Sequence, residues 1–176
     1  MIEQENGTQV QFNGQENDGV AWLKKFEFNN VIIEVDIKGK DVQGNSFVGV
    51  VFRGVDVNTF DAVYFRPFNF MSNDSVRRNH SVQYVSHPEY SRHKLRNEHL
   101  GKYENAVNPV PDPNKFFHAK IVVEKPRVSV FVNDAAKPCL VVNELSDRTG
   151  GWIGLWAGNY SDGTFANLKI IKKKVE

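Results

Sequence analysis

Apolar and polar residues alternate along most of this chain, and this alternation constrains the fold more than any other feature. In residues 31–38, VIIEVDIK, every second side chain is apolar. Successive side chains of a strand point to opposite faces of a sheet, so the segment predicts a strand that buries one face. The buried face would carry Val31, Ile33, Val35 and Ile37.

Further segments with the same period follow along the chain, separated by turn-forming residues such as Asn, Asp and Gly. We therefore expect an all-β protein of about ten to thirteen strands. A length of 176 residues suits one core, so residues 1–176 are expected to form a single domain. The expected strands include residues 47–54, 60–68, 80–86, 116–124, 128–134, 139–142, 151–158 and 165–173.

The charge of the chain is nearly balanced, with 22 Lys and Arg against 21 Asp and Glu. A formal net charge of +1 disfavours nucleic acid as a partner and favours a neutral one. We expect a monomer. We also expect no transmembrane segment, because no run approaches the roughly 20 apolar residues that a membrane helix needs. The first residues, MIEQENGTQV, lack the pattern of a secretory signal. The protein is therefore either cytoplasmic or its signal lies outside this sequence.

Residues 86–115 break the alternation and contain four of the seven prolines. A loop of about thirty residues is uncommon inside a domain and is usually functional. We expect a short helix within it, near residues 91–98. We also expect the loop to lie over one face of a sheet, where it would cover a binding site.

One face of the middle strands combines small residues with large polar ones. Gly49, Ala62 and Ser81 would leave a recess, and neighbouring guanidinium, amide and aromatic groups would meet sugar hydroxyls and C–H groups there. The alternative is a solvated face whose arginines pair with carboxylates such as Glu34, Glu89 or Glu104. The residues proposed to bind substrate are Arg53, Tyr64, Arg66, Gln83, Arg96 and Trp156.

Several runs resemble a known family. They include VGVVFRG from Val48, VYFRPFN from Val63, SVQYVS from Ser81 and GWIGLWAGNYSDGTFANLKI from Gly151. From about Phe26 to Ile171 the chain resembles the concanavalin A-like lectin/glucanase proteins that are related to the 3-keto-disaccharide hydrolase domain.

The resemblance implies a fold, a function and a location. The fold would be a two-sheet antiparallel jelly-roll sandwich of the laminin G type, with carbohydrate on a polar concave sheet face under the loop of residues 86–115. Many such proteins are bacterial, secreted or periplasmic, and assigned as glycosyl hydrolases without a demonstrated reaction. A glycoside hydrolase acting on keto-glucosides is therefore the enzymatic expectation, and a non-catalytic laminin G-like interaction domain is the alternative.

Hydrolysis of a glycoside usually needs two carboxyl groups about 5–5.5 Å or about 6.5–9.5 Å apart. Glu104 and Glu89 are the candidate acids and bases in the long loop, and His87 is a third catalytic candidate. The other interpretation is that these carboxylates hold Arg66 or Arg96 in place. Glu34 and Asp36, two residues apart on one strand, fit an ordinary solvated strand face better than a catalytic pair.

No metal site is predicted from the residues. Four of the five histidines fall between residues 80 and 99, but their spacing does not fit zinc. A structural calcium ion stays open as an alternative, with oxygen ligands from Asn133, Asp134, Asp162 or backbone carbonyls in turns. The single cysteine, Cys139, cannot form an internal disulfide and is expected to be a small core residue.

Overall fold

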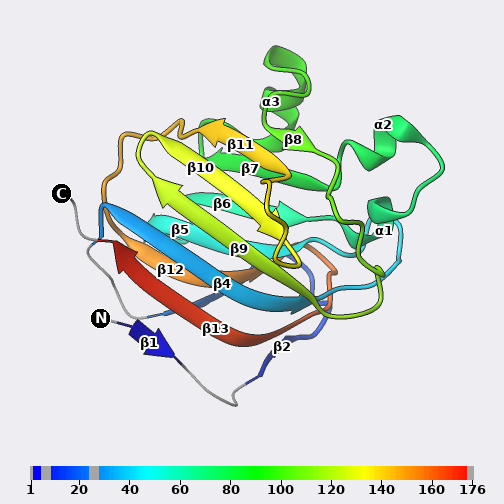
Figure 1. Cartoon of the computed structure of the whole chain (residues 1–176), viewed down its shortest axis with the longest axis horizontal. Helices are drawn as coiled ribbons and strands as arrows, with labels where there is room; N and C mark the ends of the chain where they lie inside the picture. Colours follow the sequence, from blue (N-terminus) through cyan, green and yellow to red (C-terminus); the bar gives the residue numbers. More distant parts are fainter. Residues whose placement is uncertain (1, 5–8, 24–27, 174–176) are drawn as a thin grey trace.

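Two antiparallel β-sheets pack face to face in the structure, a computed structural model that describes residues 2–4, 9–23 and 28–173 (Figure 1). Phe26, where the family resemblance begins, lies outside these described residues. The described part contains thirteen strands, which confirms the all-β prediction.

The first sheet has the order β1 (Ile2–Gln4), β13 (Gly163–Lys173), β4 (Asn30–Lys38), β9 (Phe117–Glu124), β10 (Arg127–Val132) and β11 (Leu140–Asn143), with β2 (Val10–Phe12) also paired to β13. The second sheet has the order β3 (Gly19–Trp22), β12 (Trp152–Ala157), β5 (Val48–Asp56), β6 (Thr59–Phe65), β7 (Val82–His87) and β8 (Glu104–Asn105). The short strands β1, β2 and β3 were not expected from the sequence.

The core lies between the two sheets and follows the alternation. The four apolar side chains of β4 predicted to be buried are fully enclosed, whereas Glu34 and Asp36 on the other face of the strand are partly exposed. Burial of each of these aliphatic side chains contributes about 1.5–3 kcal/mol to the stability of the folded state. Aromatic contacts join the sheets, because the ring of Phe117 in β9 meets Phe65 in β6 at 5.0 Å and Phe70 at 5.4 Å, both edge to face.

Three short helices lie beside the second sheet, α1 (Pro67–Phe70) and α2 (Ser75–Arg78) at the right-hand end of the sandwich and α3 (Arg92–Glu98) next to β8 (Figure 1). α1 and α2 follow β6 and were not expected. α3 is the helix predicted near residues 91–98. The hydroxyl of Ser91 caps it by accepting the Lys94 N–H, and the helix is anchored by Leu95, which is buried.

Within the described ranges, no helix has both the length and the apolar character needed to cross a bilayer.

Candidate functional site

A row of five cross-strand neighbours runs across the outer face of the second sheet. From β12 to β8 the row is Trp156, Gly49, Tyr64, Gln83 and Glu104. Residues that are directly opposite one another in neighbouring strands point to the same face, so all five share the face that points away from the core. The same parity in the sequence had predicted this face for Tyr64, Gln83 and Trp156.

Gly49 brings the two aromatic residues of the row together. A Cβ atom at this position would lie 2.3 Å from the Val63 carbonyl oxygen and 2.5 Å from the Tyr64 Cα, so no larger residue fits without a backbone shift. Across the gap that glycine leaves, the rings of Trp156 and Tyr64 meet edge to face with centroids 5.0 Å apart. The row thus places an aromatic pair in the middle of the sheet.

A cleft of about 240 Å³ lies beside this pair on the same face. Its floor continues along β6 with Ala62 and Phe60 and along β7 with Val85 and His87. Ala62 and Val85 are small, so the floor is recessed between the large rings. Loops form the walls, and the full lining is Asp18, Phe47, Phe60, Ala62, Tyr64, Val85, His87, Ser91, Arg92, His93, Trp156, Gly158 and Asn159.

One wall of the cleft comes from the start of α3, in the loop that was expected to cover this face. Ser91, Arg92 and His93 line the cleft there. The guanidinium carbon of Arg92 lies 5.4 Å from the centre of the Phe47 ring. On the opposite wall the Asp18 carboxylate accepts the backbone N–H of Asn159 at 2.8 Å. The cleft therefore has an aromatic and aliphatic floor and charged walls.

Arg66 lies behind Tyr64 and is almost fully buried. Its Nη2 donates to the Tyr64 hydroxyl at 2.6 Å and to the side-chain oxygen of Gln83, and its Nη1 donates to the His80 carbonyl at 2.7 Å. The Tyr64 hydroxyl in turn donates to Gln83 at 2.8 Å. Burial raises the pKa of Tyr64, so the hydroxyl stays protonated. Its hydrogen bonds to Arg66 and Gln83 hold the ring in place.

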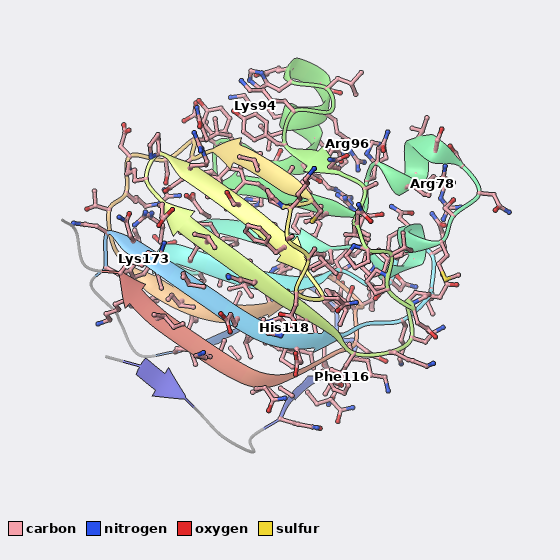
Figure 2. The ribbon with its side chains drawn as sticks, viewed as in Figure 1. Arg78, Lys94, Arg96, Phe116, His118 and Lys173 are labelled. Carbon is pink, nitrogen blue, oxygen red and sulfur yellow. The ribbon has the colours of Figure 1, made fainter. Side chains whose placement is uncertain are left out.

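Glu104 is buried at the end of the row, where two guanidinium groups and one imidazole surround it. Arg96 donates to it from Nε at 3.0 Å and from Nη2 at 2.8 Å, and the His80 Nδ1 lies 2.9 Å from Oε2. The Arg66 guanidinium lies 3.8 Å away. Figure 2 shows Arg96 projecting from α3 on the side of the molecule where β8 lies. These partners match the interpretation in which the carboxylate holds Arg66 and Arg96, and Glu104 does not line the cleft.

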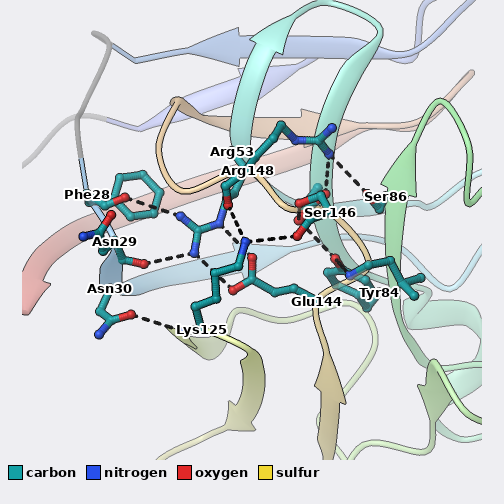
Figure 3. Close-up of polar contacts among 12 residues, drawn as sticks. Phe28, Asn29, Asn30, Arg53, Tyr84, Ser86, Lys125, Glu144, Ser146 and Arg148 are labelled. Atoms are coloured by element: carbon teal, nitrogen blue, oxygen red, sulfur yellow. Dashed lines mark hydrogen bonds and ion pairs between the residues drawn. The ribbon is translucent and has the colours of Figure 1, made fainter. Parts of the chain in front are cut away.

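The structure does not bring Arg53 to this face, which corrects its assignment as a substrate-binding residue. Arg53 is fully buried, and its Nε and Nη2 donate to Glu144 at 2.8 Å and 3.1 Å (Figure 3). Its guanidinium also donates to the carbonyl oxygens of Phe28 and Asn29. The cause is a left-handed backbone, with φ of 54° at Arg53, at an irregularity of β5 that ends the simple alternation.

The other two catalytic candidates lie in different surroundings. Glu89 is exposed, lies 3.7 Å from Lys94 and is absent from the cleft lining. His87 does line the cleft, with its ring 5.2 Å from Phe60. Burial lowers the pKa of His87, although the nearby Asp18 acts in the opposite direction, so the imidazole is neutral at pH 7. Of the three catalytic candidates, His87 lines the cleft, whereas Glu104 and Glu89 do not.

The residues considered for calcium do not gather. Asn133 and Asp134 follow β10, Asp162 precedes β13, and β9 and β4 lie between those two strands. The Asp162 carboxylate already accepts the Gly14 N–H and pairs with Lys40. Within residues 9–23 and 28–173, no group of three or more His, Cys, Asp and Glu side chains could hold a metal ion.

Cys139 is buried in the core, as expected. Burial raises the pKa of its thiol to about 11, so the thiol stays protonated and unreactive at neutral pH.

Several residues of the cleft were missed from the sequence. Phe60 shares the parity of Ala62 and Tyr64 and could have been found by extending that count along β6. Phe47, Asp18, Asn159 and Arg92 lie outside the strands, and no periodic signal places such residues on a face.

Comparison with known proteins gives structural neighbours only. No protein-family model matches the chain, and no curated protein matches its sequence. The carbohydrate-binding module CBM66 from Bacillus subtilis superposes with a TM-score of 0.63 at 18% identity, covering 96% of this chain and 94% of that one. The exoplasmic/lumenal domain of VIP36 with bound Ca²⁺ and Man3GlcNAc gives 0.65 at 13% identity, covering 100% and 84%.

A fructosyltransferase from A. japonicus gives a TM-score of 0.61 at 9% identity over 99% of this chain, which corresponds to 26% of the fructosyltransferase. At such low sequence identity these structural similarities establish the fold only. The chain has the two-sheet antiparallel jelly-roll sandwich fold of these lectin-like neighbours.

Proposed function

We propose that this protein binds carbohydrate in the cleft on the outer face of the second sheet and does not cleave it. The observation that carries the proposal is the aromatic pair of Trp156 and Tyr64 at a recessed floor with charged and polar walls. Sugar rings present C–H groups that pack on aromatic faces and hydroxyls that need polar partners at the rim.

An unpaired donor at the cleft supports the proposal. The indole N–H of Trp156 is buried and has no hydrogen-bond acceptor among the described residues. A buried donor without an acceptor costs about 1–3 kcal/mol. A ligand or an ordered water that offers an oxygen atom near this group would remove part of that cost.

The carboxylates argue for binding over hydrolysis. Asp18 is the one carboxylate among the described residues that line the cleft. Glu104 is bound by Arg96 and lies against His80, and Glu89 points to solvent beside Lys94. Neither supplies the second carboxyl group at the separation that glycosidases use. The keto-glucoside hydrolase that the family resemblance implies is thus the less supported form of the proposal.

The test is a glycan array of plant, host and microbial saccharides, followed by calorimetric titration of the best ligand. Trp156→Ala should weaken the affinity about tenfold or more, because it removes the stacking surface. Trp152→Ala is the matched control, since Trp152 lies on the same strand and outside the cleft lining. It should leave affinity within about twofold. If wild-type protein binds no saccharide, or if both variants weaken binding equally, the proposal fails.

Two further measurements separate the alternatives. Incubation with 3-keto-glucosides and with β-glucans should release no product, and steady release of sugar would establish a hydrolase. A stoichiometric protein partner recovered from a periplasmic or extracellular fraction, without any saccharide ligand, would favour the laminin G-like interaction domain. We retain a monomer and a secreted or periplasmic location as parts of the proposal, which light scattering and fractionation would test.

A further inference from the structure

Arg92 is a cation on the wall of the cleft whose charge is not neutralised nearby. It is half-buried, lines the cleft and stacks on Phe47. Its one hydrogen bond among the described residues runs from Nε to the Nε2 of the adjacent His93, at 3.3 Å. No described carboxylate lies within ion-pair distance of its guanidinium.

Positive charge is in excess around this wall. Arg66 donates to the Tyr64 hydroxyl at 2.6 Å, and Arg92 and Arg96 both lie on α3, whose first residues line the cleft. Glu104 is already shared between Arg96 and Arg66 and lies against His80. Arg66 and Arg96 thus share one carboxylate, and Arg92 on the cleft wall has none within ion-pair distance among the described residues.

The negative charge of the cleft lies on the other wall. Asp18 accepts the Asn159 N–H and acts electrostatically on His87. It forms no ion pair with Arg92 within 4.0 Å. The two walls therefore differ in charge, and the α3 wall is suited to an anionic group.

We propose that Arg92 binds an acidic substituent of the saccharide, a carboxylate or a sulfate ester. The inference rests on the proposed function, because it assigns a ligand class to the same cleft. A guanidinium group pairs with a planar or tetrahedral oxyanion through two parallel hydrogen bonds. Stacking on Phe47 fixes the plane of the Arg92 group before the ligand arrives, and partial burial reduces its screening by water. A neutral sugar would leave this charge without a partner.

The experiment compares charged and neutral forms of one saccharide by calorimetry. The carboxylate probes are an oligogalacturonate of defined length and its fully methyl-esterified form. The sulfate probes are a sulfated galactan oligosaccharide and its desulfated form. Wild-type protein should bind one acidic probe about tenfold or more tightly than its neutral form, and which one it prefers identifies the anion.

Arg92→Gln should remove this preference by weakening the acidic probe about tenfold, while the neutral form changes less than about twofold. Lys94→Gln is the matched control, because Lys94 lies on the same helix but pairs with Glu89 outside the cleft lining. It should retain the preference, and both variants should unfold at the wild-type temperature.

The outcomes separate this inference from the function on which it rests. If neutral saccharides bind and acidic ones bind no better, or if Arg92→Gln weakens both forms equally, Arg92 is not an anion site and carbohydrate binding stands. If Lys94→Gln abolishes the preference as fully as Arg92→Gln does, the attraction is general and the inference is wrong. If no saccharide on the array or among the probes binds, both proposals fall.

Discussion

Arg53 and Arg66 occupy similar positions in the sequence and opposite environments in the structure. Each follows a phenylalanine near the end of a strand of the second sheet, in the runs FRG and FRP. Both guanidinium groups are buried beside a glutamate. Arg53 lies at one end of the sandwich and ties together segments far apart in the chain, whereas Arg66 lies under the aromatic residues of the cleft.

The Arg53 guanidinium and the Glu144 carboxylate are enclosed and paired with each other. Glu144 accepts from Arg53 Nε, and the carbonyl groups of Phe28 and Asn29 each accept one further hydrogen bond from the guanidinium (Figure 3). Beside it, Asp61 accepts from Tyr84, Ser146 and Arg148. These contacts fasten residues 144–148 to the sheet, and the carboxylates there are matched by donors within the protein.

The Arg66 region is open on one side and carries more positive than negative charge. Arg96 and His80 remain 29% and 21% exposed in their side chains, whereas Arg53 and Glu144 are enclosed at 0% and 1%. An ion pair as enclosed as that of Arg53 and Glu144 offers a ligand no polar group that it could reach. A partly exposed cluster beside a cleft does offer such groups, and this difference in exposure separates the two regions.

Arg53→Leu should have the largest effect on stability. It leaves the Glu144 carboxylate buried without a partner, which costs about 3–5 kcal/mol in the free energy of unfolding. Chemical denaturation measures this loss. The double variant Arg53→Leu with Glu144→Leu should recover most of it, because no unpaired charge remains. Saccharide affinity at a temperature where the variant is folded should stay within about twofold of wild type, and a large fall in affinity would contradict the comparison.

Glu104→Gln should cost less, about 1.5–3 kcal/mol, although Glu104 contacts more cations than Glu144 does. Arg96 and His80 are partly exposed, so water replaces part of what the carboxylate supplied. Unlike Arg53→Leu, this change should also weaken saccharide binding, because Arg66 loses a partner that holds it under Tyr64. Equal losses of stability in the two variants, with affinity unchanged, would remove the distinction between the regions.

The strands and the face of the site could be predicted from the sequence because both follow from period two. Parity placed Tyr64, Gln83 and Trp156 on one outer face, and the register confirms it. The same count failed at Arg53, because a left-handed residue in β5 reverses the direction of the side chain. Alternation holds only while every residue is extended, and nothing in FRG distinguishes an extended arginine from a left-handed one.

The walls of the cleft could not be predicted for a different reason. Arg92 and Asp18 are about seventy residues apart and belong to loops whose positions depend on how the sheets pack. The sequence did predict a helix in the loop of residues 86–115, since a long proline-rich break is a local signal, and residues 91–93 of that loop line the cleft. Which of its charges line the cleft is a tertiary property.

Gly49→Ala should destabilise the protein by about 1–3 kcal/mol through overpacking, because the new methyl group meets backbone atoms of β6. Gly54→Ala on the same strand is the matched control. Its methyl group would meet the Trp22 ring at 2.6 Å, and a ring can rotate away where a backbone cannot. The first change should also separate Trp156 from Tyr64 and weaken saccharide binding. Equal effects of both alanines on affinity would show that the aromatic pair does not depend on Gly49.

The smallest expected effect is a pH dependence of stability in the Arg66 region, which contains His80. No histidine is among the hydrogen-bond or ion-pair partners of Arg53, Glu144 and Asp61 in the described part of the chain. Burial is the main cause that lowers the pKa of His80, and it outweighs the attraction of Glu104. The unfolded chain therefore binds a proton near pH 6.5 that the folded protein takes up only at lower pH.

The sign follows from that difference. The stability contributed by neutral His80 is fully present above about pH 6.5 and is lost as the pH falls through the lower folded value. Denaturation curves between pH 7.5 and pH 5 should show a shallower loss for His80→Gln than for wild type, because the backbone carbonyl that Arg66 uses is retained. His87→Gln removes a second histidine with a lowered pKa, this one in the cleft. Its slope of stability against pH is the comparison for the slope of His80→Gln. If His80→Gln has the wild-type slope, the Glu104 cluster is as insensitive to acid as the enclosed Arg53 network.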